Sequence, residues 1–186
     1  LTGGAIIPAP YKERKDISYQ TAKRIVEMVN EDLTPSKIMT KKAFENAIRV
    51  ASAIGASSNC PPHLIAIAKH MGIKIEIDDW QRLGHEIPLL VNCQPAGEHL
   101  MEGFFKAGGI PVVMQELIKN NKIHKDVLTV TGKTIAENLN KDINIDKNVI
   151  RSFSNPLVKN AGFIIMRSNF FSSAVMKTSV ISNEFR

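Results

Sequence analysis

The sequence predicts an α/β fold, a layered domain in which helices flank a largely parallel sheet. Amphipathic segments with helical spacing and short apolar runs bounded by turn residues alternate along the chain, which is the pattern typical of this class. With 186 residues the chain has the length of about one domain. The pattern is interrupted within residues 150–160. We therefore expect a domain boundary that leaves residues 1–155 in one α/β domain and places the strands over 156–186 in a second, β-rich domain or in the link into one.

Three helices are expected within the first 72 residues. Asp16 or Ser18 can cap a helix that runs to about Asn30, and Thr40 can cap a second one that ends before Gly55. A third helix is expected from the Pro61–Pro62 pair to Gly72, since proline is tolerated in a first turn. This third helix is apolar nearly all round, which predicts that it is buried.

The expected strands follow. Residues 72–78 (GIKIEID) alternate between apolar and polar, and residues 87–92 (IPLLVN) form a short apolar run. Another strand is expected over 127–132, and two late runs, 162–169 and 173–181, predict the lead-in strands of the C-terminal domain. Between them come a short helix after residue 78, a helix from about residue 98 that breaks at glycines 108–109, a helix opened by a proline at 111, and a short helix capped at 134.

Composition excludes several classes of protein. The net charge is +6, but the basic residues are dispersed rather than clustered, which argues against a nucleic-acid partner. No run of about 18 apolar residues predicts a membrane span, and the first residues do not have the pattern of a signal peptide. Cys60 and Cys93 lack CxxC spacing, and we expect them to be reduced thiols in a cytoplasmic protein.

The strongest local candidate for a binding site is the loop Gly55–Asn59. Ser57, Ser58 and Asn59 could offer donors to an anion, together with backbone N–H groups and the dipole at the start of the next helix. The alternative is a loop that only caps helices, because Ser and Asn favour such turns. His63 follows directly, and a lone histidine at this position is more often structural.

A weaker candidate is Lys133 with Thr134. The phrase TGKT ends like a phosphate-binding P-loop, but Val127 stands where the first glycine of that motif belongs, so the match fails. Lys133 could bind a carboxylate, or Thr134 could simply cap the helix that follows. The five histidines show no paired spacing, so the spacing predicts no metal site within this chain, and no GxSxG phrase occurs.

Four long phrases, in order, resemble the dihydroxy-acid and sugar-acid dehydratases. They cover residues 33–73 (LTPSKIMTKKAFENAI to HMGI), 78–118 (DDWQRLGHEIPLLVNCQPAGEH to QELI), 128–139 (LTVTGKTIAENL) and 154–186 (SNPLVKNAGF to MKTSVISNEFR). The wording of the second and fourth phrases is similar to the aldonic acid branch, such as xylonate or arabinonate dehydratases. The first residue is Leu1 rather than methionine, and we interpret the sequence as an internal piece of such a protein. The resemblance implies that residues 1–155 are the later part of the family's N-terminal α/β domain and that residues 156–186 are the link into its C-terminal domain.

The resemblance implies a hydro-lyase that converts a sugar acid or 2,3-dihydroxy acid to a 2-keto acid. It implies an iron–sulfur cluster, [2Fe–2S] or [4Fe–4S], that binds the departing hydroxyl, and a Mg²⁺ ion that holds the substrate carboxylate and a neighbouring hydroxyl. It also implies a serine base and a homo-oligomer. The family phrases that carry the cluster cysteines, the Mg²⁺ ligands and the base lie outside the region that this chain matches. The resemblance therefore implies no catalytic residue within this chain, and the chain alone is expected to be inactive.

Two departures qualify the resemblance. Cys60 and Cys93 do not match the cluster-cysteine phrases, so that role is not carried onto them. The family's Gly-Gly-Ser-Thr-Asn phrase reads here Gly55 to Asn59 with Ala56 as its second residue, which would be strained if that position needed a positive φ. The resemblance implies that Ser57, Ser58, Asn59 and His63 lie near the substrate. A non-catalytic remnant or dimerisation scaffold is the alternative, and a binding module without catalysis is a third reading.

Overall fold

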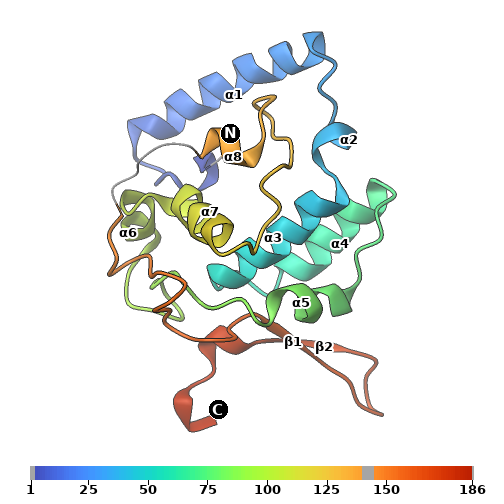
Figure 1. Cartoon of the computed structure of the whole chain (residues 1–186), viewed down its shortest axis with the longest axis vertical. Helices are drawn as coiled ribbons and strands as arrows, with labels where there is room; N and C mark the ends of the chain where they lie inside the picture. The colour runs from blue at the N-terminus through green and yellow to red at the C-terminus, as the bar shows by residue number, and fades with distance from the viewer. Residues whose placement is uncertain (1–2, 140–144, 186) are drawn as a thin grey trace.

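The computed structural model describes residues 3–139 and 145–185, and helices are its main elements (Figure 1). In chain order the elements are η1 (Gly4–Ile6), α1 (Lys12–Asn30), α2 (Pro35–Ile38), α3 (Lys41–Ala53), α4 (Cys60–His70), α5 (Ile77–Gly84), α6 (Met101–Lys106), α7 (Gly109–Lys119), α8 (Ile135–Asn138), β1 (Phe163–Met166), β2 (Ala174–Lys177), η2 (Thr178–Val180) and η3 (Asn183–Phe185).

Most of the helix starts and ends that the sequence predicts were confirmed. Thr40 caps α3, its side chain accepting a hydrogen bond from the Ala43 N–H, and Gly55 follows the end of that helix with a φ of +61°. The break at Gly108 separates α6 from α7 as expected. The first long helix starts earlier than predicted, since α1 begins at Lys12.

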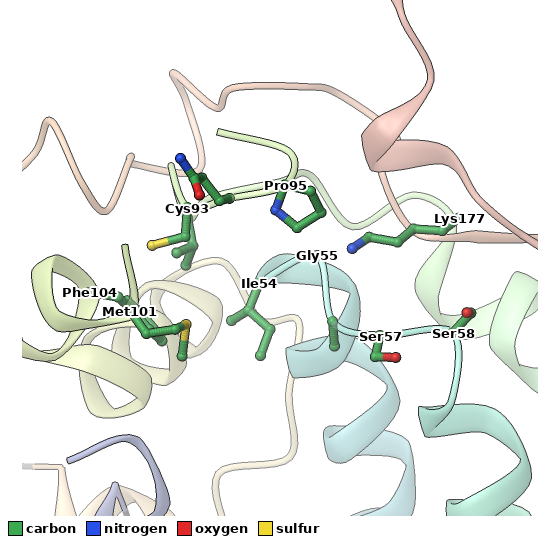
Figure 2. A pocket seen from close by; sticks show the side chains of 12 residues that line it. Ile54, Gly55, Ser57, Ser58, Cys93, Pro95, Met101, Phe104 and Lys177 are labelled. Atoms are coloured by element: carbon green, nitrogen blue, oxygen red, sulfur yellow. The ribbon is translucent and has the colours of Figure 1, made fainter. Parts of the chain in front are cut away.

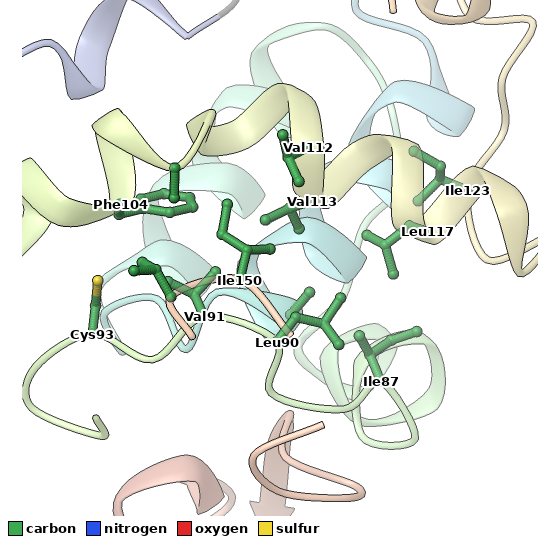
Figure 3. Close-up of a cluster of buried hydrophobic side chains, with 13 residues drawn as sticks. Ile87, Leu90, Val91, Cys93, Phe104, Val112, Val113, Leu117, Ile123 and Ile150 are labelled. Atoms are coloured by element: carbon green, nitrogen blue, oxygen red, sulfur yellow. The ribbon is translucent and has the colours of Figure 1, made fainter. Parts of the chain in front are cut away.

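The principal core lies between α3, α6, α7 and the extended run 87–93 (Figure 3). Leu90, Val113 and Leu117 are fully buried in it. Burying one such side chain stabilises the fold by about 1.5–3 kcal/mol. A second core cluster joins α3, α4, α5 and β1 around Trp80. The two clusters hold the end of α3, and the loop that follows it, in a fixed place.

The largely parallel sheet predicted from the sequence is not found within residues 3–139 and 145–185. Their one sheet has two strands, β1 and β2, which pair antiparallel with Phe163 opposite Lys177. The late strands were therefore predicted correctly, although β2 gives way to η2 at Thr178. The coarser prediction, helices combined with strands in one chain, holds.

Of the three earlier apolar runs, only 87–92 is extended along most of its length, and none forms a ladder, because their backbone groups are used elsewhere. Near the expected strand 72–78, the Glu76 N–H donates to Asp79 Oδ2 at 2.9 Å, which starts α5. In the run 87–92, the Leu89 N–H donates to Val158 O and the Leu89 carbonyl accepts from the Leu157 N–H. The next N–H, that of Leu90, donates to Ala53 O instead. The run 127–132 turns back on itself through a bridge of Leu128 with Thr134. The runs 87–92 and 127–132 thus make isolated bridges, whereas the run 72–78 passes into α5 at Ile77.

Burial of the helices differs from what the sequence predicts. Only Pro61 and Ala68 of α4 are buried, so the prediction that this helix is buried was wrong for this chain. Helix α1 lies along one edge of the molecule (Figure 1), with Met28 as its only buried residue. In the described ranges, no helix combines the length and apolarity needed to cross a membrane.

Candidate functional site

A pocket of about 440 Å³ opens between the end of α3, the run 91–95, the start of α6 and the end of β2 (Figure 2). Its walls are mostly apolar, with a few polar groups. The residues that line it are Ile54, Gly55, Ala56, Ser57, Ser58, Val91, Cys93, Gln94, Pro95, Met101, Phe104 and Lys177. The volume is within the range of small-molecule sites in proteins.

Gly55 shapes the floor of this pocket. Its φ of +61° lies in the left-handed region, and a Cβ added there would lie 2.9 Å from Cδ1 of Leu89. A glycine is therefore needed to end α3 so close to the buried run 87–93. On the opposite wall, the peptide bond between Gln94 and Pro95 is cis.

The loop after Gly55 brings two of the four predicted pocket residues to the cavity. Ser57 and Ser58 line it, and both are exposed. The Ser57 Oγ accepts a hydrogen bond from the Asn59 N–H at 3.2 Å, which leaves its own O–H free to donate. Ala56 does not have a positive φ. The strain considered for Ala56 from the sequence is therefore absent.

The other two predicted residues lie on a different cavity. Asn59 and His63 line a neighbouring, almost wholly apolar pocket of about 450 Å³ between α3 and α4. The two pockets share Ile54 and Ala56 as walls. The structure thus separates the predicted set into two pairs that line two different cavities.

The start of α4 offers few backbone donors, contrary to what the sequence suggested. The Cys60 N–H donates to Ser57 O at 3.0 Å, and the Asn59 N–H donates to the Ser57 hydroxyl. Pro61 and Pro62 have no N–H at all. The free N–H groups of a usual helix N-terminus are therefore missing or already used at these positions.

Lys177 is the pocket residue that sequence reasoning missed. It ends β2, is half-buried, and directs its ammonium group into the pocket (Figure 2). Burial lowers the pKa of Lys177, and proximity to Cys60 opposes this effect in part. In the sequence, a lysine within an expected strand gives no local signal that its side chain will line a pocket. Only the pairing of β1 with β2, which returns the chain to the loop after α3, brings Lys177 to the serines.

The two cysteines are unsuited to metal binding in this conformation. Burial raises the pKa of both Cys60 and Cys93, which favours the thiol over the thiolate that binds metals. Cys93 lines the pocket with Lys177, whereas Cys60 lines the neighbouring one. Over the described positions, no three His, Cys, Asp or Glu side chains are grouped so that they could hold a metal ion.

Lys133 and Thr134 lie beside α1, at the other end of the molecule from β2 (Figure 1). Thr134 caps α8 in a reciprocal arrangement with Glu137: the Thr134 N–H donates to Glu137 Oε2 at 2.7 Å, and the Glu137 N–H donates to the threonine hydroxyl. The Thr134 hydrogen bonds hold the pKa of Glu137 below its usual value. Capping thus occupies Thr134, and Lys133 is exposed.

Comparison with known proteins gives one consistent result. Residues 1–138 match the family model described as dihydroxy-acid/6-phosphogluconate dehydratase N-terminal. All 186 residues align with the D-xylonate dehydratase of Caulobacter vibrioides at 50% identity, covering 100% of this chain and 31% of that protein.

Two further relatives have other substrates in their names. The L-arabinonate dehydratase of Rhizobium leguminosarum is 45% identical over 98% of this chain and 32% of its own length. The dihydroxy-acid dehydratase of Acetivibrio thermocellus is 42% identical over 99% of this chain and 33% of its own. The chain thus spans about a third of the length of these relatives. The family match over residues 1–138 and the identity over the whole chain show that this chain belongs to the dihydroxy-acid/6-phosphogluconate dehydratase family.

Proposed function

We propose that this chain is part of a dehydratase that converts a sugar acid to a 2-keto acid. The observation that carries the proposal is the 50% identity, over the entire chain, with a protein named D-xylonate dehydratase. In this reaction the proton on the carbon next to the carboxylate and the hydroxyl on the following carbon leave together as water. The resulting enol then tautomerises to the 2-keto acid.

The chain's contribution to that reaction would be a wall of the substrate site. The pocket of about 440 Å³ has the size to hold a five-carbon acid, with Ser57 and Ser58 at its rim. Asn59 and His63 would lie behind that wall, on the neighbouring cavity. Lys133 and Thr134 remain weaker candidates because Thr134 is occupied in capping α8.

The proposal includes an iron–sulfur cluster and Mg²⁺, as the resemblance implies. The described residues of this chain do not fit the cluster, since the two cysteines line different cavities and burial favours their thiol forms. The same residues do not fit Mg²⁺ either, because they group no three His, Cys, Asp or Glu side chains that could hold a metal ion. The ligands would therefore come from other parts of the protein. We also propose that residues 156–186 lead into a second domain, and that the whole protein is a cytoplasmic homo-oligomer.

The test is an assay of the full-length protein, reconstituted anaerobically with iron, sulfide and Mg²⁺. We expect a 2-keto acid to form from D-xylonate or L-arabinonate, with less from 2,3-dihydroxy-isovalerate. The same preparation treated with a chelator before assay serves as the control. If none of these acids yields a keto acid, the proposed function is wrong.

One observation favours a second candidate, a scaffold or dimerisation role. Tyr19, Val26 and Val29 recur along α1 at helical spacing and are 66%, 62% and 74% exposed. A stripe of this kind is typical of a helix that packs against another surface. The test compares the oligomeric state of the full-length protein with that of its Val26→Glu, Val29→Glu variant. A dissociated variant, in a protein that has no dehydratase activity, would favour the scaffold.

A further inference from the structure

The pocket beside Gly55 has chemically different ends. The Cys93 sulfur, the Met101 side chain and the Phe104 ring gather at one end, and the Lys177 ammonium enters from the other (Figure 2). Phe104 and Cys93 are buried in the principal core, so the apolar end is fixed by packing. A pocket with one cationic end and one apolar end fits a small organic anion.

Among the described residues Lys177 has no counter-ion, whereas three other lysines have one. Lys37, Lys42 and Lys106 each hold a carboxylate oxygen at 2.7 Å. For Lys177, by contrast, no carboxylate among residues 3–139 and 145–185 forms an ion pair, although it is more buried than those three. Removing an ammonium group from water is unfavourable unless an anion compensates. The Lys177 ammonium is therefore prepared for an anion that comes from outside the described residues.

Two serines in the lining of this pocket have hydroxyl groups that can donate a hydrogen bond. The Ser57 hydroxyl accepts from the Asn59 N–H and keeps its own hydrogen for another acceptor. Ser58, exposed at the rim, has a second hydroxyl. Because Pro61 and Pro62 remove two N–H groups from the start of α4, the positive charge in this pocket comes from Lys177 rather than from the helix end.

We propose that Lys177 binds the carboxylate of the acid substrate. Ser57 and Ser58 then donate hydrogen bonds to the hydroxyl groups of the substrate, and the carbon chain of the substrate is directed toward Met101. This inference rests on the proposed function, of which it names the group that recognises the acid. A carboxylate has two oxygens and about four lone-pair sites, so one oxygen can pair with the ammonium while the other remains available to a metal ion. Lys177 is thus assigned as a specificity residue that distinguishes an acid from the corresponding neutral polyol.

The experiment compares two ligands and three variants in the full-length protein. D-xylonate is the acid, and xylitol is its neutral counterpart with the same number of carbons. Lys177→Gln removes the charge, Lys177→Arg keeps it, and Lys69→Gln removes an exposed lysine from the last turn of α4 as the matched control. Dissociation constants come from calorimetry, and KM and kcat from the keto-acid assay.

Lys177→Gln is expected to weaken D-xylonate binding roughly tenfold to hundredfold, as the loss of one charge-assisted hydrogen bond predicts, and to leave xylitol binding unchanged. Lys177→Arg should retain most of the affinity, and Lys69→Gln all of it. An unchanged affinity of Lys177→Gln for D-xylonate would overturn the inference. An equal loss for both ligands would do so as well, because it would indicate a change of shape rather than of charge.

The two proposals fail in different ways. If the unaltered protein forms keto acid but Lys177→Gln has the same KM, the inference about Lys177 is wrong and the proposed function stands. The other case is an unaltered protein that forms no keto acid but binds D-xylonate more tightly than xylitol, with Lys177→Gln losing that preference. The inference about Lys177 then stands and the proposed function is wrong.

Discussion

The Trp80 indole and the Phe163 ring meet edge to face, with their centroids 5.1 Å apart and their planes at 88°. Both side chains are almost wholly buried, at 0% and 1% exposure. Trp80 belongs to α5 and Phe163 opens β1, so this contact joins the hairpin of β1 and β2 to the helical part of the chain. It also holds β2, and with it Lys177, beside the loop after α3.

Phe163→Ala should therefore destabilise the protein by about 3–5 kcal/mol, the usual effect of removing a buried aromatic side chain. Phe170→Ala, on the loop between the same two strands, is the control, since Phe170 is 91% exposed and its loss should change stability by less than about 0.5 kcal/mol. Urea unfolding measures both. Equal effects of the two substitutions would contradict the packing described here.

Gly55→Ala should destabilise the protein more than Gly72→Ala. Both glycines have a positive φ, of +61° and +68°, so each substitution carries a strain of about 1–2 kcal/mol. At Gly55 the new methyl group would also press on Leu89, whereas nothing lies within 4 Å at Gly72. Overpacking of this kind adds about 1–3 kcal/mol. The difference between the two variants in denaturant unfolding isolates the Leu89 contact, and its absence would show that the loop relaxes freely.

Asn46→Ala should be among the more destabilising polar substitutions. Asn46 is 4% exposed and links α3 to the segment after α7: its Nδ2 donates to His124 O, and its Oδ1 accepts from the His124 N–H, both at 2.8 Å. Each partner left without a hydrogen bond costs about 1–3 kcal/mol. Asn120→Ala, which removes a single bond to Glu116 O, is the matched control. A loss for Asn46→Ala no larger than for Asn120→Ala in urea unfolding would disprove this role.

The pH dependence of Lys177 has a definite sign. Burial lowers its pKa in the folded protein, so the unfolded chain binds more protons between that lowered pKa and the ordinary lysine value of about 10.4. Stability should therefore rise with pH across this window because of Lys177, while carboxylate binding falls as the ammonium loses its proton. Comparing stability against pH for the protein and its Lys177→Met variant checks this. Identical slopes in that window would refute it.

The 186-residue chain by itself should bind no iron–sulfur cluster. Burial keeps Cys60 and Cys93 as thiols, and each cysteine lines a different cavity. Anaerobic reconstitution with iron and sulfide, followed by visible absorbance, should show no stoichiometric cluster, with the full-length protein as the positive control. A stoichiometric cluster in the isolated chain would mean that the ligands lie within it.

Local signals predicted the helices better than the strands. Thr40 and Gly55 mark the ends of α3 because capping and a positive φ depend on residues close in sequence. The run 87–92 was correctly predicted to be extended and buried, but its partners lie at residues 53, 149 and 157–158. Nothing in the run itself determines whether such partners form a parallel ladder or isolated bridges. Burial of α4 was overestimated for a similar reason, since apolar composition does not say which faces are covered.

The sequence by itself determined the family, the helix ends and the small polar loop at Ser57 and Ser58, because these depend on ordered motifs and on neighbouring residues. The tertiary structure alone decided which residues share a cavity. It placed Asn59 and His63 behind the wall on which Ser57 and Ser58 lie, and it brought Lys177 to that wall from more than a hundred residues further along the chain. The physical reason is that a pocket depends on contacts between distant segments, here the Trp80–Phe163 packing, which no local pattern encodes.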